Sequence, residues 1–104
     1  LLPAFICSGN TDVFKNKVIE LLSYSKMKLD ERKNGILGSG TIEQIENILI
    51  PELELLLTYA DKGEIYNMNK QKKLSIIWYV LDSWVFYDEF TKKVIDFQNY
   101  YIGL

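Results

Sequence analysis

Residues 41–61, TIEQIENILIPELELLLTYAD, decide the fold class, because they join a helix start signal to a long apolar stripe. Thr41 and Gln44 have the spacing of a capping box, in which each side chain accepts a hydrogen bond from the other residue's backbone. The stripe keeps one helical phase past Pro51 and contains Ile45, Leu49, Leu53, Leu56 and Ala60. The pattern therefore favours one helix over 41–61, kinked at Pro51, and two helices meeting there are the alternative.

Three more segments have helical periodicity, over about 12–29, 70–85 and 88–102. Asn10, Thr11 and Asp12 can each cap the first, Asp88 can cap the last, and glycines Gly63 and Gly103 mark helix ends. The broad apolar set of the 70–85 helix predicts a central position in a bundle. The expected inward residues are Phe14, Val18, Leu21 and Leu22, then Leu74, Ile77, Trp78, Leu81, Trp84 and Val85, then Phe90, Val94, Phe97 and Tyr101.

The length of 104 residues allows one hydrophobic core, and 48% apolar residues supply it. No segment alternates with the period of a strand. We therefore expect an all-α fold, a compact single-domain bundle of about four to five helices over 1–104. The opening LLPAFIC run predicts an apolar N-terminal arm over 1–9 that packs on the domain, and 30–40 and 64–69 are expected to be loops.

Cellular location is predicted from the single cysteine and from the opening run. Cys7 has no partner for an intramolecular disulfide, which favours a reducing compartment, so a cytoplasmic protein is expected. The opening run is too short for a signal core or a membrane span, and no membrane partner is expected.

Common catalytic constellations are missing from the sequence. There is no histidine, which excludes Ser-His and Cys-His nucleophiles and histidine-bearing zinc sites. The glycine-rich run 35–40 lacks the lysine and the preceding strand of a phosphate-binding loop, and is expected to be a flexible loop that ends in a helix cap. Four carboxylates lie close together in the sequence: Asp82, Asp88, Glu89 and Asp96. Such a group could act in acid–base catalysis or hold magnesium, but carboxylates are also typical of helix starts. We predict no enzyme, no catalytic residue, no metal and no cofactor.

Charge distribution is the most informative feature for function. The net charge of −2 and the pI near 5.1 argue against direct nucleic-acid binding, despite the cluster Lys70, Lys72 and Lys73. Segment 41–61 contains five acids and no base. Four of them share one polar arc at helical spacing, whereas Glu52 points away, which we attribute to free backbone N–H groups after Pro51. The four are Glu43, Glu46, Glu54 and Asp61.

This acidic arc has two interpretations. It is either a solvated helix surface or a face that attracts a basic partner. The helix has no lysine that could compensate the repulsion among its carboxylates, which favours the second interpretation. Among the many aromatic residues of the last part of the chain, Tyr79, Phe86 and Tyr87 are candidates for an exposed patch, with core packing as the alternative.

Three stretches resemble the small acidic helical immunity proteins of bacterial contact-dependent inhibition and related polymorphic-toxin systems: IEQIENILIPELE over 42–54, LDSW over 81–84 and FQNYYIGL over 97–104. The resemblance implies a cognate toxin domain, often a cationic nuclease, whose active site the immunity protein occludes. Glu43, Glu46, Glu54 and Asp61 would then steer association, with Tyr79 or Tyr87 as anchors.

Two other functions are consistent with the residues. One is a helical adaptor or regulatory domain that binds a partner through an apolar groove around Trp84 and Phe86. The other is an enzyme that uses carboxylates and a metal ion. High salt would weaken binding by the acidic arc and would leave binding in an apolar groove nearly unchanged.

Overall fold

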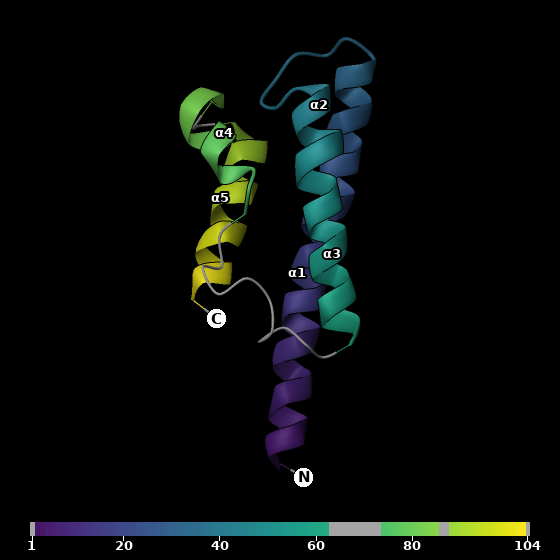
Figure 1. Cartoon of the computed structure of the whole chain (residues 1–104), viewed down its shortest axis with the longest axis vertical. Helices are drawn as coiled ribbons and strands as arrows, with labels where there is room; N and C mark the ends of the chain where they lie inside the picture. Colours follow the sequence, from purple (N-terminus) through teal and green to yellow (C-terminus); the bar gives the residue numbers. More distant parts are fainter. Residues whose placement is uncertain (1, 63–73, 86–87, 104) are drawn as a thin grey trace.

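The computed structural model describes residues 2–62, 74–85 and 88–103, and within these ranges the side chains from residue 12 onward. All regular structure in these ranges is helical, as expected for an all-α fold. Helix α1 (Leu2–Lys33) runs antiparallel to the helical stretch formed by α2 (Ile42–Gln44), η1 (Ile45–Leu49) and α3 (Ile50–Asp61). Helices α4 (Ile77–Ser83) and α5 (Glu89–Ile102) lie beside this pair (Figure 1).

Helix α1 is longer than predicted at both ends. It begins at Leu2, so the expected start near residue 12 is wrong, and Asn10, Thr11 and Asp12 lie inside the helix instead of capping it. The expected arm over 1–9 is helical from Leu2 and projects beyond the other helices (Figure 1). Its proline, Pro3, lies in the first turn. Backbone N–H groups there have no partner within the helix, so the missing N–H of proline costs no hydrogen bond. How the side chains of this part pack lies outside the described residues.

The helical stretch 42–61 is continuous, which confirms the predicted single helix and its end at Asp61. The capping box is present: Gln44 N donates to Thr41 Oγ1 at 3.1 Å, and Thr41 N donates to Gln44 Oε1 at 3.2 Å. A π-helical turn, η1, ends at Leu49, two residues before Pro51, and the N–H of Ile50 bonds the carbonyl of Ile45. Such wide turns occur where the helical ladder is disturbed, and Pro51 disturbs it because its ring crowds the carbonyl four residues earlier. The kink at Pro51 stays a prediction.

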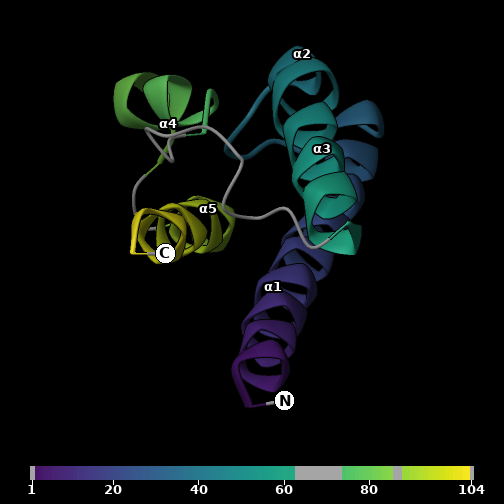
Figure 2. The same ribbon diagram turned by 60° about the horizontal axis from the view of Figure 1, so that its bottom comes forward.

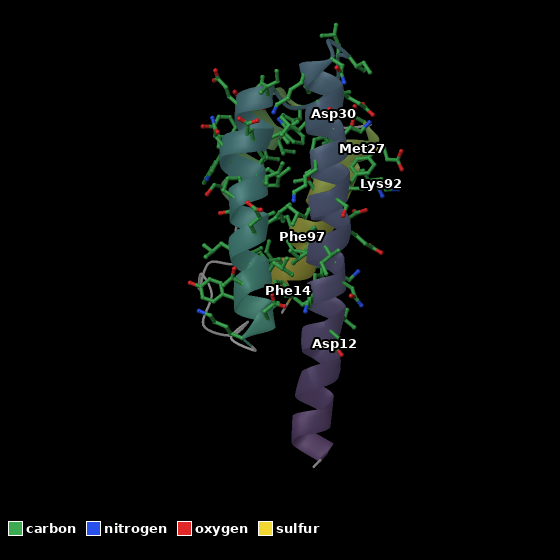
Figure 3. All side chains as sticks on the ribbon, turned by 90° about the vertical axis from the view of Figure 1, so that its right-hand side faces the viewer. Asp12, Phe14, Met27, Asp30, Lys92 and Phe97 are labelled. Carbon is green, nitrogen blue, oxygen red and sulfur yellow. The ribbon has the colours of Figure 1, made fainter. Side chains whose placement is uncertain are left out.

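One core joins the helices. The predicted inward residues of α1 and of the 42–61 stretch are buried against each other: Phe14, Val18, Leu21, Leu22, Ile45, Leu49, Leu53, Leu56 and Ala60. Helix α5 covers the same core from the other side, and the rings of Phe14 and Phe97 are 6.1 Å apart between centroids (Figure 3). Aromatic rings at such separations contribute beyond their buried area.

Helix α5 agrees with its prediction in full. The Asp88 carboxylate accepts a hydrogen bond from Phe90 N at 2.8 Å and caps the helix. Gly103 follows its last residue. The four predicted inward residues are buried, namely Phe90, Val94, Phe97 and Tyr101.

Helix α4 is shorter and more peripheral than predicted. It begins at Ile77, and residues 74–76 precede it without helical structure. Leu74, Ile77 and Trp84 are buried as expected, but Trp78, Leu81 and Val85 are exposed, whereas Ile76 and Val80 are buried. Two apolar stripes overlap in this segment at helical spacing, and periodicity alone does not decide which one faces the core. The expected central helix is therefore an outer one (Figure 2). Gly63, the 64–69 loop and the predicted helical residues 70–73 lie outside the described residues.

Candidate protein-binding surfaces

The four predicted acidic residues are exposed along one continuous helical stretch. Glu43 belongs to α2, Glu46 to η1, and Glu54 and Asp61 to α3. We call these four residues the acidic face. The core stripe occupies the opposite side of the same stretch, which is why the carboxylates project into water. No basic residue interrupts the stretch 42–61.

Two members of the acidic face pair with lysines of α1. Lys33 Nζ lies 2.8 Å from Glu46 Oε2, and Lys15 Nζ lies 2.6 Å from Asp61 Oδ1. The Asp61 hydrogen bond raises the pKa of Lys15. The expectation that the acidic face has no local compensation is therefore wrong, because the lysines come from the neighbouring helix. Glu43 and Glu54 have no ion pair among the described residues.

All four side chains of these two pairs are solvent-exposed to roughly half of their surface, between 41% and 53%. Water and salt screen such pairs strongly, so they are weak and readily rearranged. A partner that brings its own Arg or Lys side chains can replace Lys15 and Lys33. The acidic face thus combines two carboxylates without an ion pair among the described residues and two in exposed, weak pairs.

Glu52 has a different role from the one predicted. Its carboxylate oxygens accept hydrogen bonds from Ser75 N at 2.7 Å and from Ser75 Oγ at 3.1 Å. The predicted attraction to free backbone N–H groups after Pro51 is therefore wrong. Glu52 points away from the acidic face because it holds the residues that lead into α4.

The loop between α1 and α2 is held at several points, which contradicts the expected flexible loop. The Arg32 guanidinium donates to three carbonyl oxygens, of Ser39 at 2.8 Å, Gly40 at 3.1 Å and Ile36 at 3.2 Å. The buried Ser39 hydroxyl accepts hydrogen bonds from Val85 N and Thr91 Oγ1. A charged, planar donor shared by three carbonyls fixes this loop against the start of the 42–61 stretch.

Helix α4 presents a second surface, which we call the α4 surface. It consists of large apolar side chains with high exposed fractions: Trp78 at 63%, Leu81 at 57%, Tyr79 at 42% and Val85 at 41%. Tyr79 was a candidate for an exposed patch, with core packing as the alternative, whereas Trp78 and Leu81 were assigned to the core. The missing signal was the competing stripe through Ile76 and Val80. Phe86 and Tyr87 lie outside the described residues.

Trp84 does not form the expected apolar groove. Its side chain is 5% exposed and packs in the core, where its ring centroid lies 5.0 Å from that of Phe90. The indole Nε1–H donates to Gln44 Oε1 at 2.9 Å, so its single polar group is satisfied. Within residues 74–85, the exposed apolar side chains are therefore those of the α4 surface.

Candidate metal and acid–base residues are few among the described residues. The described residues contain no group of three or more Cys, Asp or Glu side chains that could hold a metal ion. The Asp88 carboxylate caps α5, which is the structural alternative foreseen for it. An open pocket of about 180 Å³ lies between α1 and α5, and its lining is Lys17, Glu20, Leu21, Lys93, Asp96, Phe97 and Tyr100.

No helix in the described ranges has both the length and the apolar character needed to cross a membrane. Comparison of the chain with protein-family models, curated proteins and solved structures finds no match. The acidic face and the α4 surface are thus the features from which a function is inferred.

Proposed function

We propose that this chain is an immunity protein that binds a basic toxin domain, in the simplest case a cationic nuclease, and neutralises it by covering its active site. The observation that carries the proposal is the acidic face, in which Glu43, Glu46, Glu54 and Asp61 are all exposed along one helical stretch without an intervening base. The chain acts by occlusion in the cytoplasm and performs no chemistry of its own. No cofactor or metal takes part.

Length and charge of the acidic face match this role. At 1.5 Å per residue, the 18 steps from Glu43 to Asp61 span about 27 Å, enough to cross an interface of ordinary size. A nuclease site attracts phosphate with positive charge, and a row of carboxylates presents charge of the same sign as a nucleic-acid backbone. Opposite net fields accelerate association by about 10- to 1,000-fold over that of uncharged surfaces.

The four carboxylates are unequal. Glu43 and Glu54 have no ion pair among the described residues, so they exert their field without compensation. The fields of Glu46 and Asp61 are reduced by Lys33 and Lys15 until the partner displaces these lysines. We therefore assign the larger steering effect to Glu43 and Glu54.

The proposal is tested with the toxin domain encoded next to this chain in its genome. The C-terminal domain of a neighbouring exported protein is expressed in a bacterial host with and without this chain, and growth is measured. Growth should be restored by the wild-type chain. Rescue should be impaired by a variant in which all four carboxylates become amides: Glu43→Gln, Glu46→Gln, Glu54→Gln and Asp61→Asn.

A matched control changes the same number of charges elsewhere. It replaces four exposed carboxylates of α1 and α5 by amides: Asp12→Asn, Glu20→Gln, Asp30→Asn and Asp96→Asn. This control should rescue growth like the wild type. Equal rescue by both variants would reject the acidic face as the binding site, and no rescue by the wild-type chain would reject the immunity function.

The alternative function is a helical adaptor or regulatory domain with no toxin partner. The exposure of Trp78 and Tyr79 favours it, because aromatic side chains are frequent anchors of protein interfaces. Salt separates the two functions. Raising the salt concentration from about 0.05 to 0.5 M should weaken capture of a partner by the acidic face strongly, and should leave capture by an apolar surface nearly unchanged.

A further inference from the structure

Helices α1 and α5 contain two similar sequences. Residues 17–24 are KVIELLSY and residues 93–100 are KVIDFQNY, so the lysine, valine, isoleucine and tyrosine are identical at equivalent positions. An acid follows the isoleucine in both segments, and a phenylalanine, Phe14 or Phe90, stands three residues before each lysine. Figure 1 shows that the two helices run in opposite directions. The similar segments therefore face each other with opposite polarity.

The aromatic contacts between these segments are reciprocal. The ring centroids of Phe14 and Tyr100 are 6.3 Å apart. Those of Phe90 and Tyr24, the equivalent residues with the two helices exchanged, are 5.7 Å apart. A contact that occurs twice in this way is typical of an interface with twofold symmetry. Here both halves of the interface belong to one chain.

The lysine contacts repeat in the same way. Lys17 Nζ lies 4.9 Å from the centroid of the Tyr100 ring. Lys93 Nζ lies 5.0 Å from the centroid of the Tyr24 ring. An approximate local twofold axis thus relates α1 and α5, and one ammonium group lies on either side of it.

The open pocket of about 180 Å³ between α1 and α5 lies across this axis, because equivalent residues line it from both helices. Leu21 and its equivalent Phe97 are buried, and we call them the apolar floor. The charged lining residues are exposed around this floor, and we call them the charged rim. The charged rim consists of the two lysines and the two acids of the similar segments, namely Lys17, Lys93, Glu20 and Asp96.

The charges of the rim are balanced in sum but do not neutralise one another. Two lysines and two acids give no net charge. None of the four side chains forms an ion pair within the described ranges. A ligand of one sign would be attracted by one half of the rim and repelled by the other half. A zwitterion, in contrast, can bond an ammonium group and a carboxylate of the rim at the same time.

The size of the pocket restricts the ligand further. A cavity of about 150 Å³ holds one benzene molecule, and pockets for drug-sized ligands measure roughly 300–1,000 Å³. The pocket between α1 and α5 is close to the first value. It therefore suits one small molecule with a single aliphatic or aromatic group on the apolar floor.

From this arrangement we infer that the pocket binds one free amino acid with an aliphatic or aromatic side chain. The ammonium group of the ligand lies between the Glu20 and Asp96 carboxylates, which come from opposite walls, and its side chain covers the apolar floor. Its carboxylate binds the ammonium group of Lys17 or, with the ligand turned about the local axis, that of Lys93. Two orientations are open because the two walls carry equivalent groups.

The first test is a titration of the intact, isotope-labelled chain with L-leucine and with L-phenylalanine, followed by NMR. We expect one or both to shift the amide signals of the lining residues in α1 and α5. N-acetyl-L-leucine lacks the ammonium group and L-leucinamide lacks the carboxylate. Each should bind about tenfold or more weakly than L-leucine, because each loses a charge-assisted hydrogen bond.

The second test uses the local symmetry. Lys17→Met and Lys93→Met should each weaken binding only about twofold, because each removes one of two equivalent orientations, whereas the double variant should weaken it about tenfold or more. Glu20→Gln should weaken binding about fivefold or more, since it changes both orientations. The matched control is Lys26→Met with Lys92→Met, at exposed positions of the same helices outside the lining, and it should stay within about twofold of the wild type. Circular dichroism establishes that each variant is folded.

Four results would overturn the inference: no amide shift with either amino acid, shifts outside the pocket only, binding of either analogue as tight as that of L-leucine, or equal losses for the two double lysine variants. The inference does not depend on the proposed function, because no residue of the acidic face lines the pocket. Amino-acid binding can therefore hold when toxin neutralisation fails, and it can fail when neutralisation holds.

Discussion

Replacement of Gln44 by Met should destabilise the fold through one buried hydrogen bond. Gln44 Oε1 accepts from Trp84 Nε1 at 2.9 Å and from Thr41 N at 3.2 Å. Methionine keeps the length and the helix propensity of glutamine but offers no good acceptor. The indole N–H, in a side chain that is 5% exposed, then has no partner, which costs about 1–3 kcal/mol.

The loss at Thr41 is smaller, because this N–H is exposed and water replaces the acceptor. Loss of a helix cap costs about 0.5–2 kcal/mol, and the lower end applies where only half of a capping box is removed. The two effects together predict a destabilisation of about 2–3 kcal/mol for Gln44→Met. Gln44→Glu keeps an acceptor oxygen at the same position and places a negative charge near a helix N-terminus, so it should stay within about 0.5 kcal/mol of the wild type.

The measurement is urea unfolding followed by circular dichroism for both variants, for Trp84→Phe and for the double variant Gln44→Met with Trp84→Phe. A double-mutant cycle should give a coupling of about 1–2 kcal/mol between Gln44 and Trp84. A coupling near zero, or equal losses for Gln44→Met and Gln44→Glu, would refute the claim that this bond holds α4 against α2.

Three further changes test other parts of the fold. Leu53→Ala truncates a fully buried side chain between α1 and α3 and should lower the free energy of unfolding by about 2–5 kcal/mol. Leu55→Ala, at an exposed position of the same helix, should lower it by less than about 1 kcal/mol in the same urea assay. Arg32→Met removes the donor to three loop carbonyls and should increase amide exchange in the loop before α2 without abolishing folding. Burial raises the pKa of Tyr101 in the folded protein. The neutral phenol therefore contributes its full stability below about pH 10, and this contribution is lost as the pH rises through the folded-state pKa. Over this pH range the urea midpoint of Tyr101→Phe should fall less than the urea midpoint of the wild type.

Local signals in the sequence were sufficient for much of the fold. The capping box of Thr41 and Gln44 and the Asp88 cap of α5 involve residues close in sequence, so their spacing alone identified them. In the 42–61 stretch the acidic residues on the opposite side marked the side that faces water. The segment 74–85 has two apolar stripes, and the one that faces the core depends on contacts from other elements, such as that of Trp84 with Gln44. The start of α1 was missed because residues that cap helices well are also tolerated inside them.

The acidic face illustrates what sequence can and cannot provide. Its exposure was predictable, since the opposite side of the helix is apolar. Its partial neutralisation was not, because Lys15 and Asp61 are far apart in sequence and meet only when α1 packs on α3. The same holds for Glu52, whose acceptor role depends on Ser75. Long-range pairs of this kind change the charge that a partner meets.

Steering by the acidic face is tested most directly by the association rate constant of the toxin domain, measured by stopped flow against salt concentration. The four-amide variant of the acidic face should associate at least tenfold more slowly than the wild type at low salt and show a flatter salt dependence, while the α1 and α5 control stays close to the wild type. Replacing Lys15 and Lys33 by Met should accelerate association, because it removes the compensating charges. Equal rates and equal salt slopes for wild type and the four-amide variant would contradict the account.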